Sequence, residues 1–239
     1  MRFFITLTAV LMALPMFAAN GSIRPVARPE VPELAPVTSP RPKLKDEQLA
    51  LFGLGKKRKR EREARKGMVC GDPALQGDAI GRVPGKIKGC GVEDAVRLKS
   101  VSGVALSQHS VMDCVTAKAL KTWVDGGLKP AFGNLGGGVS KIRVAAHYAC
   151  RTRNNQKGAK ISEHGKGHAI DISGIYLENG NEVNVLKDWG KGRGGKALAG
   201  ARKAACGPFG TVLGPGSDRF HRDHFHFDTA RYRGGPYCK

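Results

Sequence analysis

The chain has 239 residues, enough for one domain with a hydrophobic core and terminal tails. Its hydrophobic content of 41% is that of a globular protein rather than a disordered one, and 33 glycines indicate many turns. The formal net charge of +20 concerns solubility and partners, not the fold.

The first 19 residues have the pattern of a signal peptide. A start that includes Arg2 is followed by an apolar run over residues 5–19, which is too short to span a bilayer comfortably. An uncleaved anchor is the alternative interpretation. No cysteine lies in or just after this leader, so lipoprotein processing is not expected. The leader predicts a periplasmic or secreted protein.

Residues 20–67 are expected to be a disordered linker that is rich in proline and basic residues. Six of the 13 prolines fall between Pro25 and Pro42, and a dense basic run covers residues 56–63. Runs of charge often only solvate a linker. The competing interpretation is that this linker binds an anionic polymer of the cell envelope. The leader argues against nucleic acid as the partner.

Six cysteines follow the leader, and no two of them lie within four residues of each other. This spacing argues against zinc ribbons and redox CxxC motifs, and it favours three disulfides formed in an oxidising compartment. Fifteen pairings are possible, and the sequence does not choose among them. The cysteines are Cys70, Cys90, Cys114, Cys150, Cys206 and Cys238.

The folded domain is expected to cover residues 68–239. Apolar periodicity and turn signals predict its elements in chain order. They are a helix at 113–125, strands at 142–146 and 169–172, a hairpin of strands at 175–177 and 182–185, a helix at 196–205, and strands at 209–213 and 225–228. Together they predict an α+β domain with a small antiparallel sheet, flanking helices and disulfide staples.

The expected zinc site is formed by His164, Asp171 and His226. A catalytic zinc ion takes three protein ligands and keeps one position open. His164 and Asp171 are seven residues apart, and Gly165 and Gly167 allow the backbone between them to turn sharply. His226 supplies the third ligand from a separate strand. Nitrogen and oxygen ligands of this kind favour Zn²⁺.

Four further residues are candidates for catalysis. Residues two apart on a strand share a face, so His224 is expected on the same side as His226 and is the favoured contact with the attacking water or the oxyanion. Asp223 is the competing carboxylate base. His221 is a candidate to orient either base or to bind substrate. Arg151 is a candidate to stabilise the oxyanion or to bind a substrate carboxylate.

The spacing of these residues also supports a family resemblance. The pattern Ser-x-His-x-x-Gly-x-Ala-x-Asp over residues 162–171 fixes five positions, a match expected by chance about once in a million starts. It resembles the first zinc motif of the lysostaphin / D-Ala-D-Ala peptidase / hedgehog superfamily, and residues 221–226 resemble the HxxHxH arrangement of murein endopeptidases in that superfamily.

A closer resemblance, from about Cys70 to Cys238, is to the bacterial extensin-like C-terminal domain family. The segments that carry it include 148–151, 162–164, 169–172, 212–216 and 221–226. The resemblance implies a zinc-centred antiparallel sheet with His164, Asp171 and His226 as ligands. The peptidase branch with a Glu-x-x-His motif has glutamate where this chain has Asp223, whose shorter side chain is a further reason to consider His224.

Two functions follow as expectations. The first is a secreted zinc metallopeptidase that hydrolyses amide bonds in peptidoglycan peptides, of the D,D-endopeptidase or carboxypeptidase type; the resemblance implies the substrate class. The alternative is a non-catalytic, zinc-stabilised module that binds or scaffolds the cell wall. The candidate bases Asp223 and His224 favour the enzyme.

Overall fold

The computed structural model describes residue 62, residues 65–231 and residues 234–239. The predicted signal peptide and nearly all of the predicted linker lie outside these residues. Within the described part of the chain, no helix has the length and apolar character needed to cross a membrane.

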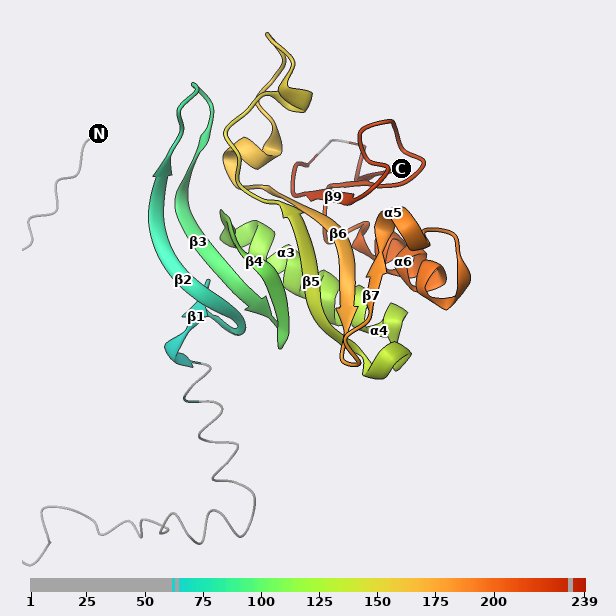
Figure 1. Cartoon of the computed structure of the whole chain (residues 1–239). Helices are drawn as coiled ribbons and strands as arrows, with labels where there is room; N and C mark the ends of the chain where they lie inside the picture. The colour runs from blue at the N-terminus through green and yellow to red at the C-terminus, as the bar shows by residue number, and fades with distance from the viewer. Residues whose placement is uncertain (1–61, 63–64, 232–233) are drawn as a thin grey trace, which may run out of the picture. The chain divides into compact units, whose positions relative to one another are not determined.

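One mixed sheet of ten strands organises the domain (Figure 1). Its order is β1-β2-β3-β4-β5-β6-β9-β8-β10, and β7 pairs with β6 beside this path. The strands are β1 (Met68–Val69), β2 (Asp72–Pro84), β3 (Gly91–Val101), β4 (Val104–Asp113), β5 (Val139–Ala146), β6 (Ala169–Leu177), β7 (Glu182–Asn184), β8 (Thr211–Leu213), β9 (Phe225–Asp228) and β10 (Tyr237–Cys238).

The sheet differs from the expected one in size and in strand direction. The prediction of a small antiparallel sheet needs correction, because the sheet has ten strands and because β4 pairs with β5, and β8 with β10, in parallel. Parallel neighbours need a crossover connection, and the helical segment between β4 and β5 supplies it. The α+β class is confirmed.

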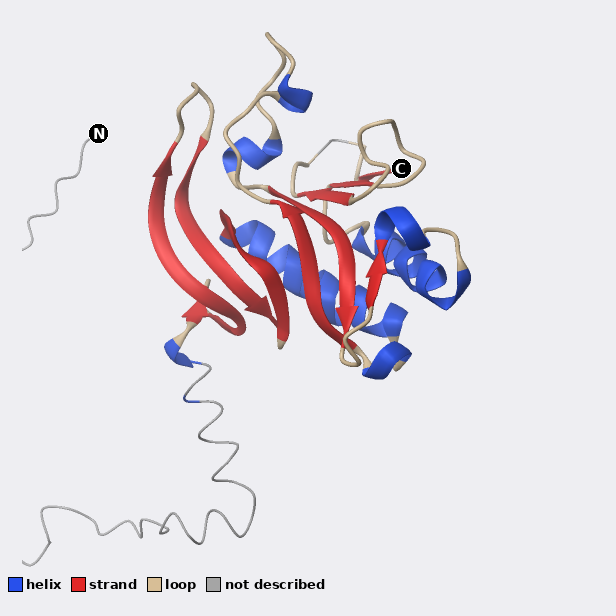
Figure 2. Ribbon diagram, in the orientation of Figure 1, coloured by secondary structure: helices blue, strands red, loops and turns tan. Residues whose placement is uncertain are grey.

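The helices lie together on one face of the sheet (Figure 2). They are α3 (Cys114–Trp123), the π-helical η1 (Val124–Leu128), α4 (Lys129–Phe132), α5 (Val185–Asp188) and α6 (Gly192–Ala205). Asp113 caps α3 by accepting a hydrogen bond from the Thr116 amide at 2.7 Å. The buried Trp123 indole donates to the Ala201 carbonyl at 2.7 Å, which joins α3 to α6.

Several predicted elements are confirmed and others need correction. The strand at 225–228 matches β9, and the one at 142–146 lies in β5. The strand predicted at 209–213 is shorter in the structure, where β8 begins at Thr211. The strands at 169–172 and 175–177 are one continuous strand, β6, and residue 185 begins α5 instead of ending a strand. Helix α6 begins four residues before position 196. Strands β1 to β4 were not predicted.

The paired strands β6, β9 and β8 present two chemically different faces. Ile170, Phe227 and Val212 are partners in register and are buried on the helix side, where the Phe227 ring meets Trp123 at 5.2 Å. The next row pairs Asp171 with His226 and His226 with Leu213. Because side chains alternate along a strand, this row faces away from the helices. One face of these strands therefore forms the core and the other is free to form a site.

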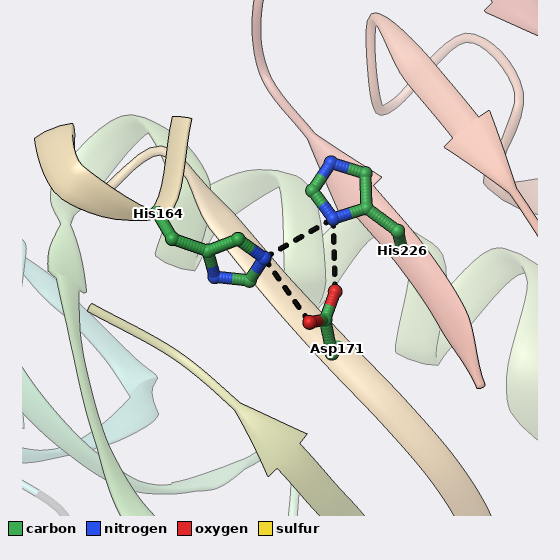
Figure 3. A group of neighbouring side chains, drawn as sticks. All are labelled: His164, Asp171 and His226. Atoms are coloured by element: carbon green, nitrogen blue, oxygen red, sulfur yellow. Dashed lines mark hydrogen bonds and ion pairs between the residues drawn. The ribbon is translucent and has the colours of Figure 1, made fainter. Parts of the chain in front are cut away.

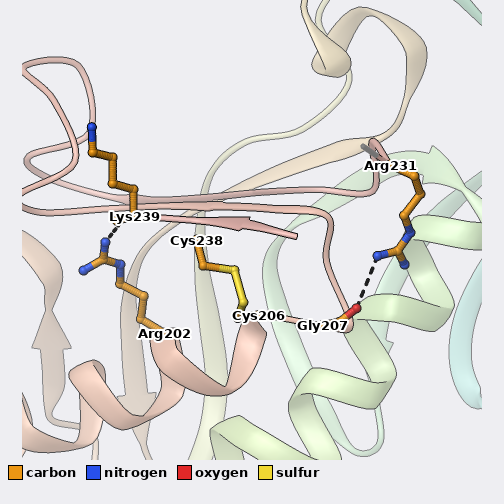
Figure 4. The surroundings of a disulfide bond; sticks show 6 residues. All are labelled: Arg202, Cys206, Gly207, Arg231, Cys238 and Lys239. Atoms are coloured by element: carbon orange, nitrogen blue, oxygen red, sulfur yellow. Dashed lines mark hydrogen bonds between the residues drawn. A yellow bond between two sulfur atoms is a disulfide. The ribbon is translucent and has the colours of Figure 1, made fainter. Parts of the chain in front are cut away.

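Three disulfides join distant segments of the domain, as the cysteine count predicted. One links the end of β1 to the start of α3, one links the β2–β3 connection to the loop after β5, and one links the end of α6 to β10 (Figure 4). The pairs are Cys70–Cys114, Cys90–Cys150 and Cys206–Cys238.

Candidate metal centre

Three side chains from separate segments converge at the predicted site (Figure 3). His164 lies on the 3-10 turn η4 (Glu163–Lys166), Asp171 on β6 and His226 on β9. The His164 Nε2 atom lies 3.1 Å from Asp171 Oδ2 and 3.2 Å from His226 Nδ1, and His226 Nδ1 lies 2.8 Å from Asp171 Oδ1. These residues form a group that could hold a metal ion.

Two glycines allow His164 to reach this position. The turn η4 ends at Gly167, whose φ of +73° lies in the left-handed region that favours glycine. A Cβ atom at Gly165 would lie 3.0 Å from Cys90 Sγ, so a side chain there would press on the Cys90–Cys150 disulfide. The expected role of glycine in a sharp turn is confirmed for Gly167, whereas Gly165 is needed for close packing against the disulfide.

The outer nitrogen of each imidazole has an oxygen acceptor. His164 Nδ1 lies 2.8 Å from the His147 carbonyl oxygen, which can only accept, so Nδ1 carries the proton. His226 Nε2 lies 3.1 Å from Asp228 Oδ2, an oxygen that can accept a hydrogen bond from this nitrogen. The inner nitrogens, His164 Nε2 and His226 Nδ1, both face the Asp171 carboxylate and would be the atoms that meet a metal ion there. Metal-binding histidines in proteins are held by such outer acceptors.

The electrostatics of the cluster favour a cation at its centre. Burial by itself would raise the pKa of Asp171, but hydrogen bonds with His164 and His226 outweigh it and hold this pKa well below its usual range. Burial by itself would lower the pKa of His226, yet Asp171 and Asp228 raise that pKa to about 9. A proton on His226, or a metal ion in its place, relieves the repulsion between the converging lone pairs.

His224 lies close to the ligands, as predicted, although it precedes β9 by one residue. Its Nε2 atom lies 3.7 Å from Asp171 Oδ2, and its Nδ1 atom lies 2.8 Å from Asp223 Oδ1. Asp223 is 63% exposed and lies behind His224 as seen from the ligands. The structure thus pairs the two competing bases, with Asp223 oriented to hold the His224 ring.

His221 completes the histidine cluster. Its ring lies 5.3 Å from the His224 ring and 5.6 Å from the His226 ring. Its Nδ1 atom lies 2.7 Å from Asp218 Oδ1. Burial lowers the pKa of His221, and Asp218 opposes this effect.

The cluster lies in an open cleft of about 550 Å³ that is also lined by Arg151, His221 and His224. Arg151 is half-buried, and within the described part of the chain its guanidinium has no hydrogen bond or ion pair. Its backbone carbonyl accepts from the Ser162 amide at 3.0 Å, and the preceding residue is Cys150 of the disulfide. The three predicted ligands and three of the four predicted catalytic residues therefore share one cleft, while Asp223 supports it from outside.

Sequence reasoning missed two buried carboxylates of the site. Asp228 was seen only as part of a strand, yet its spacing of two residues from His226 was a signal that it shares the same face. Glu163 was given no role, and its position beside His164 was the only signal. The Glu163 carboxylate accepts from Lys166 Nζ at 2.9 Å and pairs with His168 Nδ1 at 3.0 Å.

Glu163, which also lines the cleft, forms a charged pair with His168. The hydrogen bond from His168 is the largest influence on Glu163, and with Lys166 it lowers the pKa of Glu163 to about 2 despite burial. In return, Glu163 raises the pKa of His168. These contacts direct the His168 ring toward Glu163 rather than toward Asp171 and His226.

The family model described as "Extensin-like protein C-terminus" matches residues 76–239, which include every residue of this centre. The chain belongs to this extensin-like family. The expected resemblance to the extensin-like C-terminal domain family is therefore confirmed. No curated protein and no solved structure matches the chain significantly.

Proposed function

We propose that this extensin-like domain is a zinc peptidase that hydrolyses amide bonds in peptidoglycan peptides, as a D,D-endopeptidase or a carboxypeptidase. The observation that carries the proposal is the pair of histidines His164 and His226. Each is held by an oxygen acceptor at its outer nitrogen and directs its inner nitrogen at Asp171 inside an open cleft. A purely structural histidine pair does not need an open cleft beside it.

Zinc fits the donor set. Two imidazole nitrogens and one carboxylate oxygen are the ligands of known catalytic zinc sites, and three protein ligands leave a position for the reacting molecules. When bound there, zinc supplies Lewis acidity that polarises the scissile carbonyl and makes water a stronger acid. The kinship with the lysostaphin / D-Ala-D-Ala peptidase / hedgehog superfamily belongs to the same proposal, and it rests on the motif at residues 162–171.

The proton transfers fall to His224 in this proposal. Asp223 holds the Nδ1 atom of His224, which leaves Nε2 directed at the cleft and near Asp171. His224 is therefore placed to take a proton from the attacking water and to give it to the leaving amine. Asp223 positions His224 and stabilises its charged form, and so the shorter reach of an aspartate does not matter.

Arg151 and His221 act on the substrate. The Arg151 guanidinium lines the cleft without a partner among the described residues, so it is free to bind the oxyanion or a substrate carboxylate. The ring of His221 is held by Asp218 and lines the cleft, so it is placed to bind substrate. A basic protein with a predicted export signal and three disulfides fits a periplasmic or secreted site of action on an anionic wall polymer.

The test is digestion of purified peptidoglycan by the zinc-loaded protein, followed by chromatography of the muropeptides. We expect new products from the unaltered protein, and we expect the His226→Ala variant to lose both zinc and turnover. His109→Ala is a matched control, because His109 is exposed on β4 away from the cleft. His224→Ala should keep its zinc and lose turnover.

The outcomes separate the proposed functions. Unchanged muropeptides with a zinc-loaded, folded protein would refute the peptidase and support the alternative, a zinc-stabilised module that binds or scaffolds the wall. Full turnover by His226→Ala would remove the ligand assignment.

A further inference from the structure

The cleft has two chemically different ends. In the sheet order, the loop between β5 and β6 lies on one side of the ligand-bearing strands, and β8 and β10 lie on the other. The loop contributes Arg151 and Arg153, together with two asparagines. The opposite end is lined by the uncharged side chains Thr211, Leu213, Phe220 and Tyr237.

The acidic groups near the uncharged end are already paired. Asp228 bonds to His226, and Asp218 bonds to His221. Neither carboxylate is therefore free to attract a charged ligand. The two exposed aromatic rings, Phe220 and Tyr237, have 41% and 51% of their surface accessible, although both line the cleft.

Thr211 carries an unused hydrogen-bonding group at this end. The residue is 5% exposed, and its Oγ1 is the one buried side-chain polar atom in the described chain without a partner. In register, Thr211 is opposite Asp228 and beside Tyr237, so its side chain lies on the cleft face. Burying a hydroxyl without a partner is costly, and a ligand that enters the cleft is a means of satisfying it.

The C-terminal segment holds Tyr237 beside Thr211, its partner in the parallel pairing of β10 with β8. The Tyr237 amide donates to the Gly210 carbonyl at 2.7 Å, and the Cys206–Cys238 disulfide fixes the adjacent residue to the end of α6. Arg202 also donates to the Lys239 carbonyl. The aromatic wall of this end is thus attached to the helix layer by a covalent bond.

We infer that Thr211, Leu213, Phe220 and Tyr237 form a subsite for an uncharged residue of the substrate peptide, beside the bond that is cut. In this subsite Thr211 bonds to a polar backbone atom of the peptide, and the aromatic rings pack on its side chain. The Cys206–Cys238 disulfide positions Tyr237. The inference rests on the proposed function and adds an orientation to it: the acidic part of the peptide lies toward Arg151 and a neutral residue lies toward Tyr237.

The test measures steady-state kinetics of the zinc-loaded full chain on a synthetic stem pentapeptide that ends in D-Ala-D-Ala. Thr211→Val removes only the hydroxyl, and we expect KM to rise about tenfold, the loss of one hydrogen bond, with little change in kcat or zinc content. We expect its unfolding temperature to stay the same or rise, since the hydroxyl has no partner in the protein. Thr122→Val, on the exposed side of α3, is the matched control.

A second pair of variants tests the aromatic wall. Tyr237→Ala should raise KM, and the Cys206→Ser/Cys238→Ser variant should reproduce this rise while retaining zinc. Tyr176→Ala, on β6 away from the cleft, is the control.

Each outcome has a separate meaning. If the unaltered protein cleaves the peptide but Thr211→Val keeps its KM, or unfolds at a clearly lower temperature, the subsite is refuted and the peptidase stands. If the unaltered protein neither binds nor cleaves the peptide, both the peptidase and the subsite are refuted.

Discussion

Replacement of Asp228 by asparagine isolates the effect of the outer carboxylate on metal binding. The two oxygens of Asp228 have different partners: Oδ1 accepts from the Ala230 amide at 3.0 Å, and Oδ2 pairs with His226 Nε2 at 3.1 Å. Asparagine has a similar shape but only one acceptor oxygen. In Asp228→Asn, either the amide of Ala230 or the imidazole of His226 must therefore face an NH₂ group.

The size of the effect follows from this loss. A hydrogen bond to a charged group contributes about 1.5–3 kcal/mol, which corresponds to a factor of about ten or more in an equilibrium constant. Loss of outer partners of metal-bound histidines typically weakens metal binding by about 10- to 100-fold. We expect the zinc dissociation constant of Asp228→Asn to rise within that range, with the first ligands intact.

Competition with a chromophoric zinc chelator measures this constant. Asp78→Asn is a suitable control, because it changes the charge equally but lies at the surface, where Asp78 binds Lys99 at 2.8 Å. If Asp228→Asn and Asp78→Asn bind zinc equally well, the role given to Asp228 is wrong, and with it the reason why His226 presents Nδ1 to the metal.

Two further predictions concern stability. The pKa of Glu163 falls from 4.5 to about 2 on folding, so its contribution is present above about pH 4.5 and is lost as the pH falls toward 2. Denaturant titrations measure the free energy of unfolding at each pH. Between pH 5 and 2 this free energy should fall by up to about 3 kcal/mol less in Glu163→Gln than in the unaltered protein. An equal fall in both proteins would contradict the ion pair with His168. The Cys90→Ser/Cys150→Ser variant removes a link across 60 residues and should lower the free energy of unfolding by about 2–4 kcal/mol. It should also lower kcat/KM, because the disulfide holds the segment that carries Arg151. An unchanged kcat/KM would show that the disulfide does not position that residue.

The sequence predicted the parts of the fold whose apolar pattern is local and regular. In β9, Phe225 and Phe227 alternate with His226 and Asp228, and the strand was predicted to the residue. In β5, the buried Ile142 and Val144 alternate with the exposed Lys141, Arg143 and Ala145, which gives the same signal.

Apolar alternation does not predict strands that are held by hydrogen bonds to their neighbours and bury few side chains. Leu75 is the only buried residue of β2, which leaves no alternation to detect. In β3, Ala95 and Val96 are adjacent and both buried, and register shifts interrupt its pairing with β2. The early start of α6 was missed because residues 192–195 include three glycines, which have low helix propensity.

The sequence predicted more of the candidate site's residues than of the strands in the sheet that carries them. Ligand types and spacing identified His164, Asp171 and His226, because metal chemistry restricts residue types more strongly than strand pairing does. The pairing of Asp223 with His224 was not predictable, because it depends on the bend before β9. The acceptor for His164 is the backbone carbonyl of His147. Every residue type has such a carbonyl, so the sequence gives no signal for this contact.

The alternating faces of β9 fix the positions of the side chains in the candidate metal centre, because burial of one face sets the register of the strand. Sliding β9 by one residue along β6 would turn Phe225 and Phe227 out into solvent and bury His226 and Asp228 beneath the helices. Exposing two phenylalanine rings and burying two ionisable groups would cost several kcal/mol, so misalignment is penalised before any ion arrives. Burial of Phe225 and Phe227 on one face of β9 thereby sets the position of His226 on the other.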